Sequence, residues 1–162
     1  GTMRFLFASE TKPLPRVQCV QNAYNLLNRT HDVAMAEIWL REQVGLLAYS
    51  PLAQGFLSGK YLNGAQPPLA RNTLFNRGQR YEKPGAEAAI ADYVALAKEL
   101  GVDPSQLALA FVTSRPFVTS TIIGATTMEQ LKSDIGSVDL AITPAIGARI
   151  DAIHQLRGNP SP

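Results

Sequence analysis

Leu46-Leu47-Ala48-Tyr49-Ser50-Pro51 is the stretch that decides the fold class of this chain. The run is apolar without strict alternation and ends at a proline, which is typical of a strand buried on both faces in a parallel sheet. Runs at residues 17–22 and 118–123 predict two more strands. Segments with helical spacing lie between and after them, so the order predicts parallel strands joined by right-handed crossovers. Because three strands are few, we expect an α/β fold that is part of a larger sheet or barrel.

Short local signals mark where several predicted helices begin. Asp103-Pro104 and Thr143-Pro144 each place an N-cap residue before a proline at the first helical position. The helix that follows Asp103-Pro104 is apolar almost all round, so we expect it to be buried. Thr126 and Glu129 have the spacing of a capping box, which predicts a helix start at Thr126.

Apolar spacing predicts which helix faces are buried. A helix over residues 33–44 has Thr30 or Asp32 as a candidate cap and Gly45 as its stop. Its expected apolar stripe consists of Val33, Ala36, Leu40 and Val44. The expected stripe of the helix after Thr126 consists of Met128, Leu131 and Ile135. The polar tail at residues 157–162 is expected to fray.

Composition excludes several classes of protein. The chain has 162 residues, of which 46% are hydrophobic and 17% charged, as in a globular domain. A net charge of +2 without a basic run gives no sign of nucleic-acid binding. No apolar run reaches the ~20 residues of a membrane helix, and the N-terminus lacks a secretory signal. We therefore expect a cytoplasmic protein with no membrane partner.

Cysteine and histidine usage gives no metal site. Cys19 is the single cysteine, which excludes an intramolecular disulfide framework. His31 and His154 lie far apart, so a structural zinc is not expected. Neither histidine has an obvious nucleophile nearby, and we expect both to be exposed to solvent rather than catalytic.

Polar residues follow each predicted strand, and parallel strands bring their carboxyl ends to one rim where α/β folds bind ligands. Gly124-Ala125-Thr126-Thr127 passes from a strand into a helix, where backbone N–H groups suit a phosphate. Gly55 to Lys60 could place a cation and backbone donors against a pyrophosphate, although its spacing is not that of a P-loop. Ordinary turns would explain both stretches equally well. Tyr49 could stack on a heterocycle or simply pack in the core.

The segment at residues 54–85 is too long for a plain connection, so we expect it to be functional or mobile. Its arginines, Arg71, Arg77 and Arg80, are by themselves more typical of solvated charges than of ligands.

Three long stretches resemble one family in the right order. Residues 20–29, 47–61 and 114–131 are similar to the sixth strand, the seventh strand with its loop, and the eighth strand with its helix in aldo-keto reductases. The similarity is greatest to the branch of bacterial Tas-like proteins and potassium-channel β subunits. It implies that residues 1–162 are the C-terminal part of a (β/α)8 TIM barrel, about strands 6–8 with their helices and no second domain.

The resemblance also implies a site for NADP(H), with NAD(H) not excluded. Gln21 matches the residue that hydrogen-bonds the nicotinamide carboxamide, and Tyr49 matches the aromatic that stacks on the nicotinamide ring. The pyrophosphate loop is matched by Ser50, Leu52, Gly55 and Lys60. Arg71 matches a loop arginine near the phosphates.

The adenosine end of the implied site matches less closely. Gly124, Thr126 and Gln130 match the group around the 2′-phosphate. Ser133 and Asp134 stand where the family commonly has Glu-Asn facing adenine. This difference, together with Gln130 in place of an arginine, leaves the preference between NADP and NAD open.

The resemblance places the catalytic aspartate, tyrosine, lysine and histidine outside this chain. We therefore expect the chain alone to be inactive and to act as the cofactor-binding half of an aldo-keto reductase that transfers hydride to an aldehyde, ketone or sugar. Its expected partners are a small carbonyl substrate and the N-terminal half of the barrel, and a homo-oligomer is left open. The alternative is a truncated, non-catalytic nucleotide-binding or regulatory module.

Overall fold

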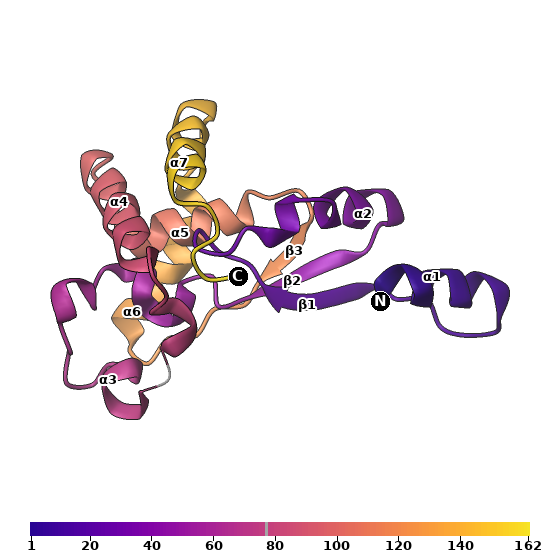
Figure 1. Ribbon diagram of the computed structural model, residues 1–162, viewed down its shortest axis with the longest axis horizontal. Coiled ribbons are helices and arrows are strands. Elements are labelled where there is room, and N and C mark those ends of the chain that lie inside the picture. The colour runs from indigo at the N-terminus through magenta and orange to yellow at the C-terminus, as the bar shows by residue number, and fades with distance from the viewer. Residues whose placement is uncertain (77) are drawn as a thin grey trace.

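A parallel three-stranded sheet in the order β1-β2-β3 organises the chain (Figure 1). The computed structural model describes residues 1–76 and 78–162. The strands are β1 (Cys19–Ala23), β2 (Gly45–Tyr49) and β3 (Val118–Thr121). The parallel α/β architecture is confirmed, and the apolar run at residues 46–50 supplies the central strand.

The two faces of this sheet differ in what covers them. Leu46 and Ala48 of β2 are fully buried, whereas Leu47 between them is only partly buried. Leu47 pairs with Gln21 on one side and Ser120 on the other, and both of these residues are exposed. Because paired residues in a sheet point to the same face, one face packs in the core and the other is open. An open inner face is what part of a barrel would present.

The helices and single turns account for most of the remaining chain. The helices are α1 (Thr2–Thr11), α2 (Met35–Glu42), α3 (Arg71–Phe75), α4 (Ala86–Glu99), α5 (Pro104–Thr113), α6 (Met128–Gly136) and α7 (Pro144–Arg157). Short 3-10 turns lie at Thr30–Asp32, Ala53–Ser58, Leu62–Gly64, Gln79–Tyr81 and Ser137–Asp139. Residues 54–85 thus contain α3, the turns at Leu62–Gly64 and Gln79–Tyr81, and most of the turn at Ala53–Ser58. Among the described residues, no helix has the length and apolar character needed to cross a membrane.

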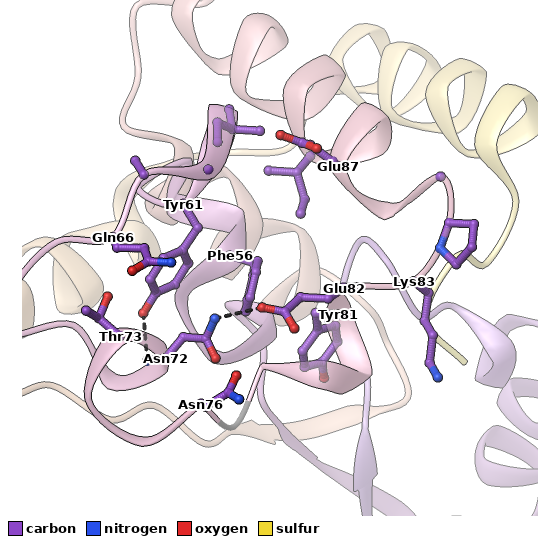
Figure 2. Close-up of a pocket in the computed structure, with 16 residues that line it drawn as sticks. Phe56, Tyr61, Gln66, Asn72, Thr73, Asn76, Tyr81, Glu82, Lys83 and Glu87 are labelled. Carbon is purple, nitrogen blue, oxygen red and sulfur yellow. Dashed lines mark hydrogen bonds between the residues drawn. The ribbon is translucent and has the colours of Figure 1, made fainter.

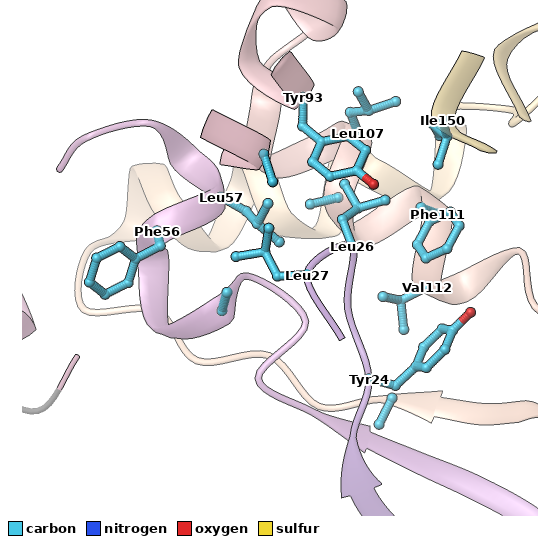
Figure 3. Close-up of a cluster of buried hydrophobic side chains, with 14 of the residues drawn as sticks. Tyr24, Leu26, Leu27, Phe56, Leu57, Tyr93, Leu107, Phe111, Val112 and Ile150 are labelled. Carbon is cyan, nitrogen blue, oxygen red and sulfur yellow. The ribbon is translucent and has the colours of Figure 1, made fainter. Parts of the chain in front are cut away.

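The core forms around α5, which is buried as predicted. Its six residues from Leu107 to Val112 are all buried. Figure 3 shows Phe111 of α5 next to Tyr24, which follows β1, and their rings stack with centroids 5.9 Å apart. Ile150 of α7 and Tyr93 of α4 reach the same cluster. The core therefore joins the end of β1 to three helices that come much later in the sequence.

The proline-marked helix starts are confirmed, and the capping box is wrong by one residue. The Asp103 carboxylate accepts hydrogen bonds from the backbone of Ser105 (2.8 Å) and Gln106 (3.2 Å). Thr143 caps α7 in the same way. At α6 the cap is Thr127, whose hydroxyl accepts from Gln130 N–H at 3.2 Å, because the chain enters the helix one residue later than predicted.

Two predicted apolar stripes are wrong in part. At α2, Val44 is buried and Ala36 packs against the core as predicted, but Val33 and Leu40 are exposed. The buried side chain of the helix itself is Trp39, which packs into the core. Thr30 and Asp32 form a separate 3-10 turn and do not cap α2. In α6, Met128 and Ile135 are exposed. The helix turns a different face toward α5, where Gln106 Nε2 donates to the Ser133 carbonyl at 3.1 Å.

The expected exposure of His31 and the expected fraying of the tail are also wrong. His31 is 6% exposed, and its Nδ1 accepts a hydrogen bond from Trp39 Nε1 at 3.2 Å. His154 is partly buried. In the tail, Ser161 is buried and its N–H donates to the Leu27 carbonyl at 3.2 Å. Contacts with residues 27–29 therefore hold a segment whose own sequence has no helical or strand pattern.

Candidate functional site

The carboxyl ends of the three strands lie at one end of the sheet. Figure 1 shows α1 at the opposite end, and α3 and α6 on the side toward which the strands run. Ala23 pairs with Tyr49, and Ala48 pairs with Thr121, so the last residues of all three strands are neighbours. Gln21 is exposed on the same sheet face as Tyr49, two residues back along β1. The structure thus brings Gln21 and Tyr49 to one rim.

Tyr49 has an arginine partner that the sequence did not identify. Arg80 Nη1 donates a hydrogen bond to the Tyr49 hydroxyl at 3.4 Å. That hydrogen bond holds the pKa of the Arg80 guanidinium above its ordinary value. Arg80 is therefore not a plain solvated charge. Its bond to Tyr49 connects the long segment at residues 54–85 to the end of β2. The two residues are 31 positions apart in the sequence, so local sequence patterns do not predict this contact.

Ser50 follows β2 in a left-handed backbone conformation, with φ of 53°. Asn25, which is fully buried, stabilises this turn because its Nδ2 donates to the Ser50 carbonyl at 2.9 Å. The same amide contacts the Tyr81 hydroxyl at 3.2 Å. Asn25 thereby ties the loops after β1 and β2 to the long segment. Nothing in the sequence around Asn25 marks it, because its role depends on contacts with residues distant in sequence.

The loop after β2 folds tightly and brings Gly55 and Lys60 together. Ala53, Gln54 and Gly55 all have positive φ. A Cβ at Gly55 would lie 3.0 Å from Cε and 3.1 Å from Nζ of Lys60, so glycine makes room for the lysine. Leu52 is partly buried at the start of this turn, and its carbonyl accepts from Gly55 N–H at 2.8 Å.

Lys60 has its charge available for a ligand. Its Nζ lies 5.3 Å from the centre of the Tyr61 ring. No carboxylate of the described residues forms an ion pair with it. A half-buried ammonium beside a turn with several positive φ values is a suitable site for an anionic group. Arg71 is exposed at the start of α3, and Arg77 lies outside the described residues.

At the start of α6, two of the predicted site residues, Thr126 and Gln130, are hydrogen-bonded to each other. Gln130 Oε1 accepts from Thr126 N–H at 2.9 Å and from the Thr126 hydroxyl at 3.0 Å. The Gln130 Nε2 group is left as the side-chain donor for a ligand. Gly124 is exposed, and a Cβ there would meet nothing within 4 Å. All three residues are open to solvent at the N-terminal end of a nine-residue helix.

Asp134 differs from the other predicted site residues because it is buried. It is 6% exposed, and burial, with a smaller effect from the charge of Asp103, raises the pKa of its carboxyl. A buried carboxylate without a cation is unfavourable. Asp134 is thus less accessible than Gln130, one turn earlier on the same helix.

A buried arginine links the loop after β1 to α7. Arg29, 7% exposed, bonds to Asp32 at 2.7 Å and to Asp151 at 2.8 Å. Tyr24 donates its hydroxyl proton to Asp32 at 2.6 Å, and burial raises the Tyr24 pKa. These groups lie in the core beside Phe111, so we assign them to stability. In the part of the chain that the structure describes, no cluster of three metal-ligating side chains occurs.

The family model and the individual relatives that this chain matches agree with one another. The family model for the aldo/keto reductase family matches residues 3–155. The chain is 50% identical to "Protein tas" of Escherichia coli strain K12, over all of this chain and 47% of that protein. It is 33% identical to "Aldo-keto reductase" of Babesia bovis, over 95% of this chain and 57% of that protein.

A third relative is "Probable voltage-gated potassium channel subunit beta" of Arabidopsis thaliana, with 32% identity over 83% of this chain and 43% of that protein. The chain therefore spans about half the length of the curated relatives it matches.

Proposed function

Because this chain belongs to the aldo/keto reductase family, we propose that it forms the NAD(P)H-binding part of a reductase barrel acting on small carbonyl compounds. The observation that carries the proposal is the loop after β2, where Gly55 leaves room for a Lys60 ammonium that has no carboxylate partner among the described residues. An open cation beside a ligand-binding rim suits a pyrophosphate.

The residues at the rim fit a dinucleotide in their chemistry. Gln21 offers an exposed amide that can both donate to and accept from a carboxamide. Tyr49 offers an aromatic face, and its hydroxyl is held by Arg80. We propose that Ser50, Leu52, Gly55, Lys60 and Arg71 bind the pyrophosphate. Gly124, Thr126 and Gln130 would bind the adenosine phosphate, and Asp134 would lie at the adenine end.

The bound cofactor would supply hydride to the carbonyl carbon of the substrate. This chain would contribute orientation: Tyr49 fixes the face of the nicotinamide ring, and Gln21 fixes its rotation. The proton for the carbonyl oxygen would come from a general acid outside this chain. The uncovered sheet face, with Gln21, Leu47 and Ser120, would pack toward the other strands of the barrel.

A binding experiment with matched glutamines tests the cofactor site. Gln21→Ala should weaken NADPH binding measured by calorimetry, because it removes the exposed amide of β1 that we propose for the nicotinamide carboxamide. Gln18→Ala is the control, since Gln18 is also exposed but lies before the amino end of the same strand. Equal dissociation constants for the two variants would refute the proposed nicotinamide contact. Titration with NADH in parallel decides the cofactor preference.

A non-catalytic regulatory role is the second candidate. The relatives named as voltage-gated potassium channel β subunits favour it. Both candidates predict NADPH binding, and they differ in turnover. If a complete barrel that contains these residues binds NADPH but does not oxidise it in the presence of reactive aldehydes, the regulatory role is supported.

A further inference from the structure

A hollow beneath the long segment at residues 54–85 has the features of a second small-molecule site. It has a volume of about 770 Å³ and lies between α3, the turn at Gln79–Tyr81 and the start of α4 (Figure 2). Pockets of ~300–1,000 Å³ are typical of small-molecule sites. None of the residues that we propose for the dinucleotide lines this hollow. We propose that it binds a small molecule with a ring and a cationic amine, and the next four features support this.

One wall is aromatic. The rings of Phe56 and Tyr61 lie with centroids 4.6 Å apart, and Tyr81 lies 6.3 Å from Phe56. Figure 2 shows Phe56 between Tyr61 and Tyr81, with Glu82 next to Phe56 and Asn72 below Tyr61. Aromatic walls stabilise a ring by stacking and a cation by its attraction to the ring face.

Polar groups lie among these rings and are held in place by hydrogen bonds. Asn72 Nδ2 donates to Glu82 Oε1 at 2.8 Å, and Asn72 Oδ1 accepts from Gly78 N–H at 2.6 Å. The Asn72 N–H donates to the Tyr61 hydroxyl at 3.1 Å, which joins these polar groups to the aromatic wall. Asn72 therefore links Tyr61, Gly78 and Glu82 at the edge of the hollow.

A hydroxyl that lines the hollow lacks a protein partner. Thr73 Oγ1 is buried and has no hydrogen-bond partner among the described residues. Buried polar atoms are nearly always hydrogen-bonded. A polar group of a bound molecule would satisfy this hydroxyl.

Charge selects the class of ligand. Glu82 and Glu87 both line the hollow, and each uses one carboxylate oxygen on a chain donor, Asn72 Nδ2 and Asn63 N–H respectively. Their second oxygens remain as acceptors. Lys83 is the one cation among the lining residues that the structure describes, and Figure 2 shows its side chain directed away from Asn72. Counted over the lining residues that the structure describes, the wall is net negative, which favours an ammonium over a carboxylate.

Tyramine and 4-hydroxyphenylacetate are a matched pair of probes, because they share the phenol ring and differ in the charge of the side chain. We expect tyramine to bind the 162-residue chain at least tenfold more tightly by calorimetry, and Thr73→Val to weaken it. Glu82→Gln keeps the acceptor for Asn72 but removes the charge, and it should weaken tyramine about three- to fivefold. Glu129→Gln is the control, since Glu129 is exposed on α6. Circular dichroism checks that each variant is folded.

Three results would overturn the assignment. They are a failure of tyramine to bind, equal affinity for the two probes, and equal effects of Glu82→Gln and Glu129→Gln. Addition of saturating NADP⁺ distinguishes this site from the proposed cofactor site. Displacement of tyramine would mean that the two sites are one, whereas unchanged tyramine binding while NADP⁺ is bound supports a separate site. If NADP⁺ does not bind, the proposed cofactor site fails, and the comparison of Glu82→Gln with Glu129→Gln decides this site.

Discussion

Lys60→Ala should weaken NADP(H) binding in the complete barrel far more than Lys98→Ala. The Lys60 ammonium lies against Gly55 in the loop after β2 and has no ion-pair partner among the described residues. Lys98 is exposed on α4. A hydrogen bond to a charged group contributes ~1.5–3 kcal/mol, so the loss should be about 10- to 100-fold in affinity for Lys60 and about twofold or less for Lys98.

Comparing Lys60→Ala with Lys98→Ala separates the effect of where the lysine lies from the effect of losing a positive charge. Each substitution removes one positive charge and one four-carbon side chain, so long-range attraction of the anionic cofactor changes equally. Quenching of NADPH fluorescence gives both dissociation constants. Lys60→Arg should recover part of the affinity, because it restores the charge in the same place. If the two alanine variants bind NADPH equally, the loop after β2 does not hold the pyrophosphate.

Three further results are expected. Arg29→Met should lower the free energy of urea unfolding by about 3 kcal/mol, because it leaves Asp32 without its buried partner; an exposed pair such as Arg41–Glu37 should contribute less than ~1 kcal/mol. Burial lowers the pKa of His31 below its ordinary value, so the unfolded chain takes up a proton on this histidine at a higher pH than the folded chain does. The free energy of unfolding should therefore fall as pH drops below about 6.5. If His31→Gln has the same dependence of unfolding free energy on pH as the original chain, this explanation is wrong. The chain alone should show no NADPH-dependent aldehyde reduction and should associate through its open sheet face, which sedimentation at several concentrations would detect; turnover at the rate of ordinary reductases by a monomer would contradict both.

Local signals in the sequence predicted the parts of the fold that depend on neighbouring residues. Asp103 and Thr143 cap their helices as predicted, because an N-cap bond reaches only two or three residues along the chain. The burial of Trp39 in place of Leu40 could not be predicted in this way. Which face of a helix is buried depends on what packs against it, and for α2 that is a core assembled from distant segments.

In the candidate site too, contacts between residues close in sequence could be predicted, and contacts between distant segments could not. Gly55 and Lys60 are five residues apart, and their proximity could be expected from the turn between them. The Tyr49–Arg80 and Asn25–Ser50 contacts join segments that are far apart in sequence, so only the folded chain brings them together. The docking of Ser161 on Leu27 is a similar case, because nothing in the tail itself specifies its partner.

Backbone amide chemical shifts on addition of NADP⁺ test the proposed cofactor site most directly. If the carboxyl ends of β1, β2 and β3 bind the dinucleotide, the largest shifts should fall on Gln21, on residues 49–60 and on residues 124–130. The amide of Ile150, in the core side of α7, should not move. Shifts confined to residues outside the strand ends, or no shifts at saturating NADP⁺, would contradict the proposal.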